Sequence, residues 1–165
     1  MKKKTLFILT LLFTVGLDYT SVQAQNTDKQ RNVYNEHYKQ IECLAKNIYF
    51  EARDQSDLGQ KAIAWVTLNR VHSKGYPSTI CDVVWQDSQF SWTHDGKSDT
   101  PKNQEDWIRA KKLASLVYTR YYNPRTYKDP TDGAIMFHAT YAKPYWRKSY
   151  ERTIRIGDHI FYKDS

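Results

Sequence analysis

The 165-residue sequence lacks most of the short patterns that announce a particular chemistry. No serine or threonine lies in a nucleophile-elbow pattern, and no glycine-rich loop suited to phosphate is present. The five histidines include no pair at the spacing by which one helix face binds zinc. The two cysteines belong to no local redox or metal motif, and the chain has no internal repeat or low-complexity tract. These absences argue against elbow-type serine hydrolases, phosphate-loop enzymes, helical zinc enzymes and repeat proteins.

The first 24 residues have the features of a secretory signal peptide. Three lysines precede an apolar run from Leu6 to Val15, and Val22 and Ala24 stand at the cleavage-determining positions. The apolar run is too short to anchor the chain in a bilayer. We therefore predict a signal peptide over residues 1–24, a flexible leader over 25–34 and one domain over 35–165. The mature protein is expected to be exported, to the periplasm or to the outside of the cell.

The chain is basic, and it carries two cysteines. Its formal net charge of +7 falls to +5 once the three lysines and Asp18 of the signal are removed. Such a charge suits an anionic partner, but it does not choose between a cell-wall polymer, nucleic acid and a membrane surface. In an oxidising compartment an even cysteine count favours a disulfide between Cys43 and Cys81. The alternative is two buried free thiols.

Hydrophobic periodicity predicts helices first and a small antiparallel sheet last. Helices are expected over about residues 35–52, 56–71 and 78–84, and a further long helix starts near 107 and ends before 123. A strand is expected over 134–138, followed by a hairpin of 153–156 and 159–162 on a two-residue turn at Gly157 and Asp158. The predicted class is α+β, mainly helical with a small C-terminal antiparallel sheet.

Glu51 falls on the apolar stripe of the first predicted helix. At about 3.6 residues per turn it lies within roughly 20° of Leu44 around the helix axis. An acid on this face points to the interior or to a cleft, where the ionised form is disfavoured and the pKa rises. A raised pKa is what a proton donor near neutral pH requires. The alternatives are a structural pair with Arg or Lys, or a helix that ends early and leaves Glu51 in solvent.

Aromatic side chains make up 15% of the chain, and many lie among polar neighbours in predicted loops. Flat apolar faces with polar edges suit sugar rings, and they also suit single-stranded nucleic acid. His138 and His159 are placed so that they can meet across the sheet. A structural hydrogen-bonding role is the default for both, and a place on a cleft wall is the alternative. We expect no metal there, because the sequence announces no third ligand.

Five motifs, in order along residues 43–163, resemble the catalytic domain of cell wall hydrolases related to the spore cortex-lytic enzyme SleB. They are YFEAR at 49–53, GQKAIAWVTLNRV at 59–71, YPSTICDVVWQ at 76–86, QFSW at 89–92 and IGDHIFY at 156–162. The resemblance implies a lysozyme-like domain over 35–165. It also implies cleavage of peptidoglycan glycan strands between N-acetylmuramic acid and N-acetylglucosamine, usually as a lytic transglycosylase that gives 1,6-anhydro products.

By this resemblance Glu51 is the catalytic acid and then the base, and no cofactor is needed. The family often has Gly and Glu where this chain has Asp54 and Gln55, so any second acid would have to be Asp54 or Asp57. A monomer is expected, with peptidoglycan as partner, no nucleic acid and no membrane anchor after signal cleavage. Aromatic or polar character near the matched motifs predicts the substrate-binding residues Gln89, Phe90, Ser91, Trp92, His138, Tyr141 and Trp146.

Three other functions stay open at this point. A hydrolytic muramidase would share the fold and the substrate but add water to the cleaved bond. A wall-binding module without catalysis would use the same aromatic surface. A basic secreted nuclease is suggested only by charge and aromatic content.

Overall fold

The computed structural model describes residues 6–123 and 128–165, and the chain divides into two units, residues 1–38 and residues 39–165. Helix α1 (Leu6–Ala52) begins in the first unit and ends in the second. Lys2, Lys3 and Lys4 of the predicted signal lie outside the described residues. In the part of the chain that the structure describes, no helix combines the length and the apolar character needed to cross a membrane. The signal peptide and the domain boundaries remain predictions.

Residues 25–34 differ from the expectation of a loose leader, because they are helical within α1. Their side chains are exposed, so this stretch is held by backbone hydrogen bonds along the helix and not by packing. The sequence has no apolar stripe here, and periodicity therefore had no signal by which to predict the helix. From residue 21 onward, where side-chain burial is described, the first buried side chain of α1 is Gln40, at the start of the second unit.

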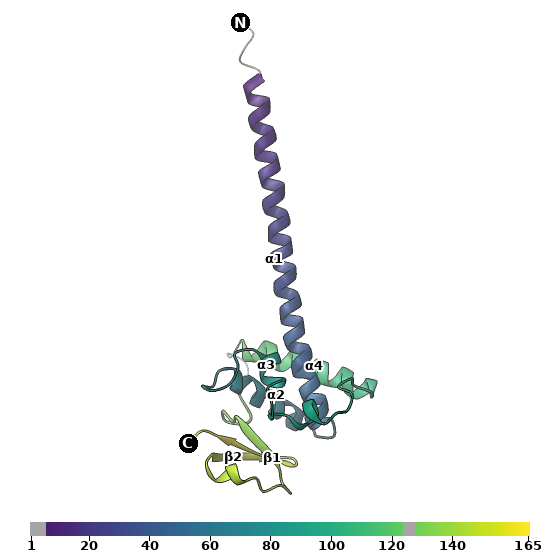
Figure 1. Cartoon of the computed structure of the whole chain (residues 1–165), viewed down its shortest axis with the longest axis vertical. Coiled ribbons are helices and arrows are strands. Elements are labelled where there is room, and N and C mark those ends of the chain that lie inside the picture. The colour runs from purple at the N-terminus through teal and green to yellow at the C-terminus, as the bar shows by residue number, and fades with distance from the viewer. Residues whose placement is uncertain (1–5, 124–127) are drawn as a thin grey trace. The chain divides into compact units, whose positions relative to one another are not determined.

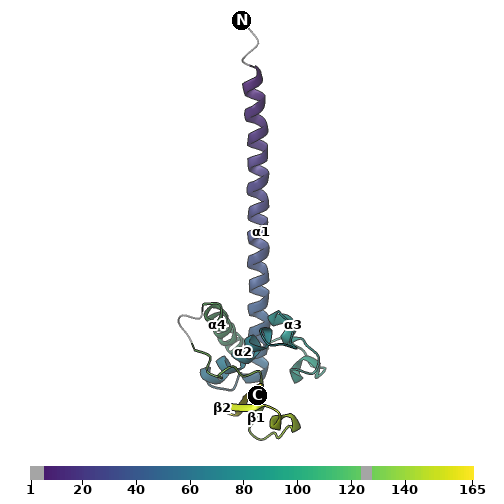
Figure 2. The same cartoon turned by 90° about the vertical axis from the view of Figure 1, so that its left-hand side faces the viewer.

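Three further α-helices belong to the second unit, and they start where the sequence provides caps. In α2 (Asp57–Val71) the Ser56 hydroxyl accepts a hydrogen bond from the backbone of Gly59, as predicted for a helix start at this position. The short α3 (Ile80–Val84), expected over residues 78–84, is capped by Thr79, whose hydroxyl accepts a hydrogen bond from the backbone of Asp82. Asn103 caps α4 (Gln104–Tyr121). Figures 1 and 2 show α2, α3 and α4 gathered around the C-terminal part of α1.

The C-terminal sheet has three antiparallel strands in the order β1-β3-β2. They are β1 (Met136–Ala139), β2 (Glu151–Ile156) and β3 (His159–Lys163). Ile156 pairs with His159, which leaves the predicted two-residue turn at Gly157 and Asp158. In both cartoon views the strands lie to one side of the helices (Figures 1 and 2). The α+β class is confirmed.

Two clusters of buried side chains form the core. One joins α1, α2, α3 and α4, and it contains Leu44, Ile48 and Leu68. The other packs the end of α1 and α2 against the sheet, through Val66 and Phe161 among others. Glu51 lies between Ile48, in the first cluster, and Ala52, in the second, and the acid therefore sits at the junction of helices and sheet.

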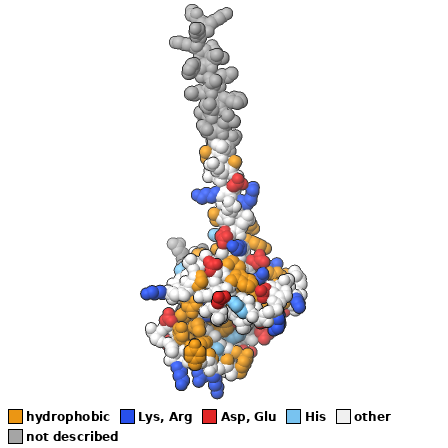
Figure 3. Space-filling model, viewed as in Figure 1, with side chains coloured by type: hydrophobic (Ala, Val, Ile, Leu, Met, Phe, Trp, Pro, Cys, Tyr) orange, Lys and Arg blue, Asp and Glu red, His pale blue; other side chains and the backbone are white. Residues whose placement is uncertain are grey.

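The predicted disulfide is confirmed, because Cys43 of α1 is bonded to Cys81 of α3. Gln40 reinforces the same junction, since its side-chain oxygen accepts a 2.9 Å hydrogen bond from the backbone of Cys81. The surface of the unit is mixed in character: Figure 3 shows hydrophobic patches with Lys and Arg side chains spread around them.

Candidate active site

Glu51, on the last turn of α1, opens into a groove of about 630 Å³. The stripe on which it was predicted to lie is confirmed, because Leu44, Ala45 and Ile48 are fully buried. The Glu51 side chain itself is half-buried. Burial raises the pKa of its carboxyl from the usual 4.5 to about 7, against a smaller opposing effect of the Arg70 cation. Glu51 therefore holds its proton up to near-neutral pH while facing an open groove.

Arg70 is a buried cation on α2 that also lines this groove. Its guanidinium lies 5.3 Å from the ring centre of Tyr76 and 5.0 Å from that of Phe90, and its Nε donates a 2.7 Å hydrogen bond to the carbonyl of Ile135. Its Nη1 has no hydrogen-bond partner among the described residues. A fixed cation beside Glu51 lowers the cost of ionising that acid when it gives up its proton.

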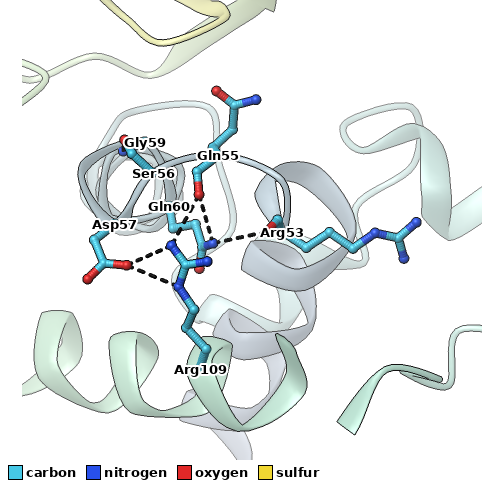
Figure 4. Close-up of polar contacts among 7 residues, drawn as sticks. All are labelled: Arg53, Gln55, Ser56, Asp57, Gly59, Gln60 and Arg109. Carbon is cyan, nitrogen blue, oxygen red and sulfur yellow. Dashed lines mark hydrogen bonds and ion pairs between the residues drawn. The ribbon is translucent and has the colours of Figure 1, made fainter. Parts of the chain in front are cut away.

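The loop between α1 and α2 is held by a network of polar contacts (Figure 4). The buried Gln60 side chain donates hydrogen bonds to the backbone carbonyls of Arg53 and Gln55, at 3.3 and 3.2 Å. Arg109 of α4 donates to the Gln55 carbonyl and forms a 2.7 Å ion pair with Asp57. Asp57 is thus occupied structurally at the start of α2.

No second carboxylate lines the groove among the described residues. Asp57 is engaged by Arg109, and Asp54 is exposed and absent from the groove wall. Neither candidate second acid lines the groove with Glu51, although the charge of Asp54 acts on His159, which does. Glu51 is the one acid among the described lining residues.

Gln55 joins the loop after α1 to the hairpin of the sheet. Its side-chain oxygen accepts a 3.2 Å hydrogen bond from the backbone of Asp158, and its nitrogen donates to the Asp158 carboxylate at 3.3 Å. Gly157 permits this approach: it has φ +55°, and a Cβ there would lie 2.5 Å from the Gln55 oxygen. A glutamate at position 55 would have no N–H to donate, so the contact with the Asp158 carboxylate depends on the Gln55 amide.

Most of the predicted substrate-binding residues line the groove with Glu51. They are Gln89, Ser91, His138, Tyr141 and Trp146. Tyr141 is 88% exposed, so its ring is free to stack on a ligand, whereas Trp146 packs edge-on against His138 and Tyr162. The groove wall therefore combines exposed rings, of which Tyr141 is one, with a fixed aromatic cluster.

Phe90 and Trp92 do not line this groove, although Trp92 lines the neighbouring cavity, and a part in substrate binding stays a prediction for both. Phe90 is only 2% exposed and packs in the core against Arg70. Trp92 is buried too: its ring stacks on Phe50 with centres 4.6 Å apart, and its Nε1 donates to the side chain of Asn47. The polar neighbours in the sequence suggested exposed rings, but the 3₁₀ helix η1 (Ser91–His94) turns Trp92 inward.

The two sheet histidines share the groove wall but differ in their partners. Both ring nitrogens of His138 are engaged, Nδ1 with the Ala139 carbonyl at 2.8 Å and Nε2 with the Tyr162 hydroxyl at 3.0 Å. Nδ1 of the buried His159 has no hydrogen-bond partner among the described residues. Burial also lowers the pKa of His159, which favours its neutral form. His159 therefore lines the groove as a histidine that favours the neutral form and whose Nδ1 is buried without a partner among the described residues.

Sequence reasoning missed several groove residues, of which Arg70, Ser88 and Tyr145 are the most informative. Arg70 follows Ile63 and Val66 on the buried face of α2. The helical periodicity that placed Glu51 on an inward face could therefore have placed Arg70 on one as well. Ser88 has a left-handed backbone with φ +62°, a conformation that no feature of the sequence announces. Tyr145 begins the 3₁₀ helix η2 (Tyr145–Lys148) and is 92% exposed.

A half-buried acid at a helix end, facing a groove with aromatic walls, is the arrangement of a glycosidase-type catalytic domain. Comparison with known proteins gives the family. The sequence model of the Cell Wall Hydrolase family matches residues 54–162, and this chain belongs to that family. Glu51 lies just ahead of the matched range. The resemblance to SleB-related hydrolases is confirmed.

Several relatives are spore cortex-lytic enzymes. That of Bacillus cereus is 32% identical over 124 residues, which are 74% of this chain and 44% of the relative. That of Halalkalibacterium halodurans is 31% identical over 141 residues, 82% of this chain and 38% of the relative. The chain thus spans less than half the length of these curated relatives.

The fold also matches solved structures. The catalytic domain of the germination-specific lytic transglycosylase SleB from Bacillus anthracis aligns with a TM-score of 0.62 at 30% identity, over 75% of this chain and 93% of that chain. The catalytic domain of the Bacillus cereus SleB protein aligns with a TM-score of 0.61, also at 30% identity, over 75% of this chain and 89% of that chain.

Proposed function

We propose that this protein is a lytic transglycosylase that cleaves peptidoglycan glycan strands between N-acetylmuramic acid and N-acetylglucosamine. The observation that carries the proposal is the Glu51 carboxyl, whose pKa of about 7 keeps it protonated in a groove with no second carboxylate among its described lining residues. The name of the Bacillus anthracis relative, a lytic transglycosylase, supports the same reaction.

In the first step Glu51 gives its proton to the glycosidic oxygen while the bond from that oxygen to the anomeric carbon breaks. The muramic acid ring passes through an oxocarbenium-like state, and the N-acetylglucosamine leaves with a new hydroxyl. Arg70 supports this step because its positive charge stabilises the Glu51 carboxylate that forms.

In the second step the C6 hydroxyl of the same muramic acid attacks its anomeric carbon. The hydroxyl proton passes to the Glu51 carboxylate, so a 1,6-anhydro ring closes and the acid is regenerated. No water is consumed and no cofactor takes part. Enzymes that add water place a second carboxylate across the bond as nucleophile or base. The single acid of this groove suits an internal hydroxyl as the attacking group.

The groove offers contacts that suit a sugar chain. Tyr141 and Tyr145 project exposed rings, against which the apolar face of a pyranose packs. His159 and Gln89 supply polar groups for hydroxyls and acetamido groups. We further propose that the protein is exported and associates with the cell wall, where its net positive charge favours an anionic polymer.

The test is the pair Glu51→Gln and Glu42→Gln, assayed for clearing of purified sacculi and for co-sedimentation with them. Both residues lie on α1, but Glu42 is exposed and lies away from the groove, so its variant is the matched control. We expect Glu51→Gln to bind sacculi and to lose at least about a hundredfold in rate, as expected for removal of an acid–base group. Native clearing by Glu51→Gln would refute the proposal, and so would binding without clearing by the wild-type protein.

A further inference from the structure

A second cavity, of about 460 Å³, adjoins the catalytic groove. Ser91 lines both spaces, and Phe50 and Arg53, which flank Glu51 along the chain, line the second one. We propose that this cavity binds the peptide stem that peptidoglycan carries on its muramic acid, with Arg53 and Lys102 receiving a stem carboxylate. This inference rests on the proposed function, because it assigns a further part of the same substrate.

The charges of the cavity favour an anionic ligand group. Among its lining cations, Lys97 is paired with Asp95 at 3.2 Å. Arg53 and Lys102 are exposed, and neither has a carboxylate partner among the described residues. Figure 4 shows the Arg53 side chain extending away from the network that holds its backbone carbonyl. Two cations are thus left available to a ligand at the edge of this cavity.

The buried Tyr49 contacts both the backbone of Lys102 and the guanidinium of Arg53. Its hydroxyl accepts hydrogen bonds from the backbone of Lys102 at 3.1 Å and of Asn103 at 3.0 Å. The guanidinium of Arg53 lies 5.4 Å from the centre of the same ring. One side chain therefore fixes both the end of the 91–102 segment and the position of Arg53. Because the Arg53 guanidinium and the Lys102 backbone are already positioned, binding there costs less conformational entropy than at a mobile segment.

A peptide suits this cavity better than a further sugar does. The sugars of the strand offer mainly neutral hydroxyl and acetamido groups, whereas a stem peptide carries free carboxylates and an amine. Asp99 lines the cavity without a cation partner among the described residues, and it suits the amine. The stem is attached to the muramic acid whose linkage Glu51 breaks. A stem site must therefore lie next to Glu51, as this cavity does.

The experiment compares two substrates: glycan strands that carry their stems, and the same strands after an amidase has removed the stems. The full-length protein is assayed on both, and kcat/KM on stem-bearing strands is divided by kcat/KM on stem-free strands. We expect this ratio to fall about fivefold in Arg53→Ala/Lys102→Ala, the effect of losing two exposed charge contacts. Because each ratio is taken within one protein, a partial loss of folded enzyme cancels.

The matched control is Lys74→Ala/Lys112→Ala, which removes the same charge at exposed positions outside the cavity, and it should keep the wild-type ratio. The single charge reversal Lys102→Glu, at an exposed side chain, should lower the ratio as well. An unchanged ratio in the cavity variants would overturn the inference. Equal losses on both substrates would overturn it too, because they would indicate a sugar site. If the wild-type protein cut neither substrate, that result would refute the proposed function itself.

Discussion

Replacing Glu51 by Gln should stabilise the protein at alkaline pH and leave its stability at acid pH unchanged. In the unfolded chain the carboxyl loses its proton near 4.5, whereas burial in the folded chain raises its pKa to about 7. Between these two values the folded state binds more protons than the unfolded state, so the free energy of unfolding falls as pH rises. Above pH 7 the accumulated cost is about 3 kcal/mol, at about 1.4 kcal/mol for each unit of pKa shift. A neutral amide of the same shape does not carry this cost.

The assay is urea unfolding of the wild type, Glu51→Gln and Glu42→Gln at pH 4, 6 and 8. The stability gain of Glu51→Gln should be near zero at pH 4, partial at pH 6 and about 3 kcal/mol at pH 8. The exposed Glu42 should show no such trend. A gain that is the same at pH 4 and at pH 8 would refute the reasoning, because it would show that the Glu51 carboxyl titrates alike in the folded and unfolded chains.

Three further perturbations test the surroundings of the acid. Gly157→Ala should cost about 2 to 3 kcal/mol in thermal unfolding, because it combines a left-handed backbone with displacement of the Gln55 side-chain oxygen from its hydrogen bond to Asp158. Gly96→Ala, with open space around its Cβ, should cost only about 1 kcal/mol, and equal losses would contradict the close approach. Arg70→Met removes the cation that lowers the pKa of Glu51, so the highest pH at which the protein clears sacculi should rise. If that pH limit did not change, the cation would not act on the acid. Reducing the disulfide between α1 and α3 should lower the free energy of unfolding by about 4 kcal/mol, as expected for a closed loop with a sequence separation of 38. The same urea midpoint with and without reductant would contradict this prediction.

Periodicity correctly predicted that Glu51 lies on the inward face of α1, because a helix imposes its 3.6-residue repeat on every side chain, polar or apolar. The same rule predicted the α1 stripe and most of α2. Leu58, an apolar residue in the first turn of α2, is nevertheless 48% exposed, whereas Gly59 and Gln60 beside it are buried. The hairpin was predictable for a local reason as well, since a Gly-Asp pair between two β-rich runs specifies a two-residue turn.

The groove wall could be predicted only in part, because it depends on tertiary contacts. Trp92 was expected at the surface, but it is buried because Asn47 of α1 accepts its N–H and Phe50 stacks on its ring. Arg70 was overlooked because a cation is rarely buried, and two rings and a backbone carbonyl make its burial tolerable here. Neither set of partners is adjacent in sequence to the residue that it holds.

The central claim is that one acid in this groove breaks the glycan strand with the help of the sugar's own hydroxyl. The mass of the soluble products tests this claim most directly. Purified sacculi digested by the wild-type protein should release muropeptides with a 1,6-anhydromuramic acid end, which lack a reducing terminus. Products heavier by one water, with a reducing end, would contradict the account and show that water attacks the anomeric carbon instead.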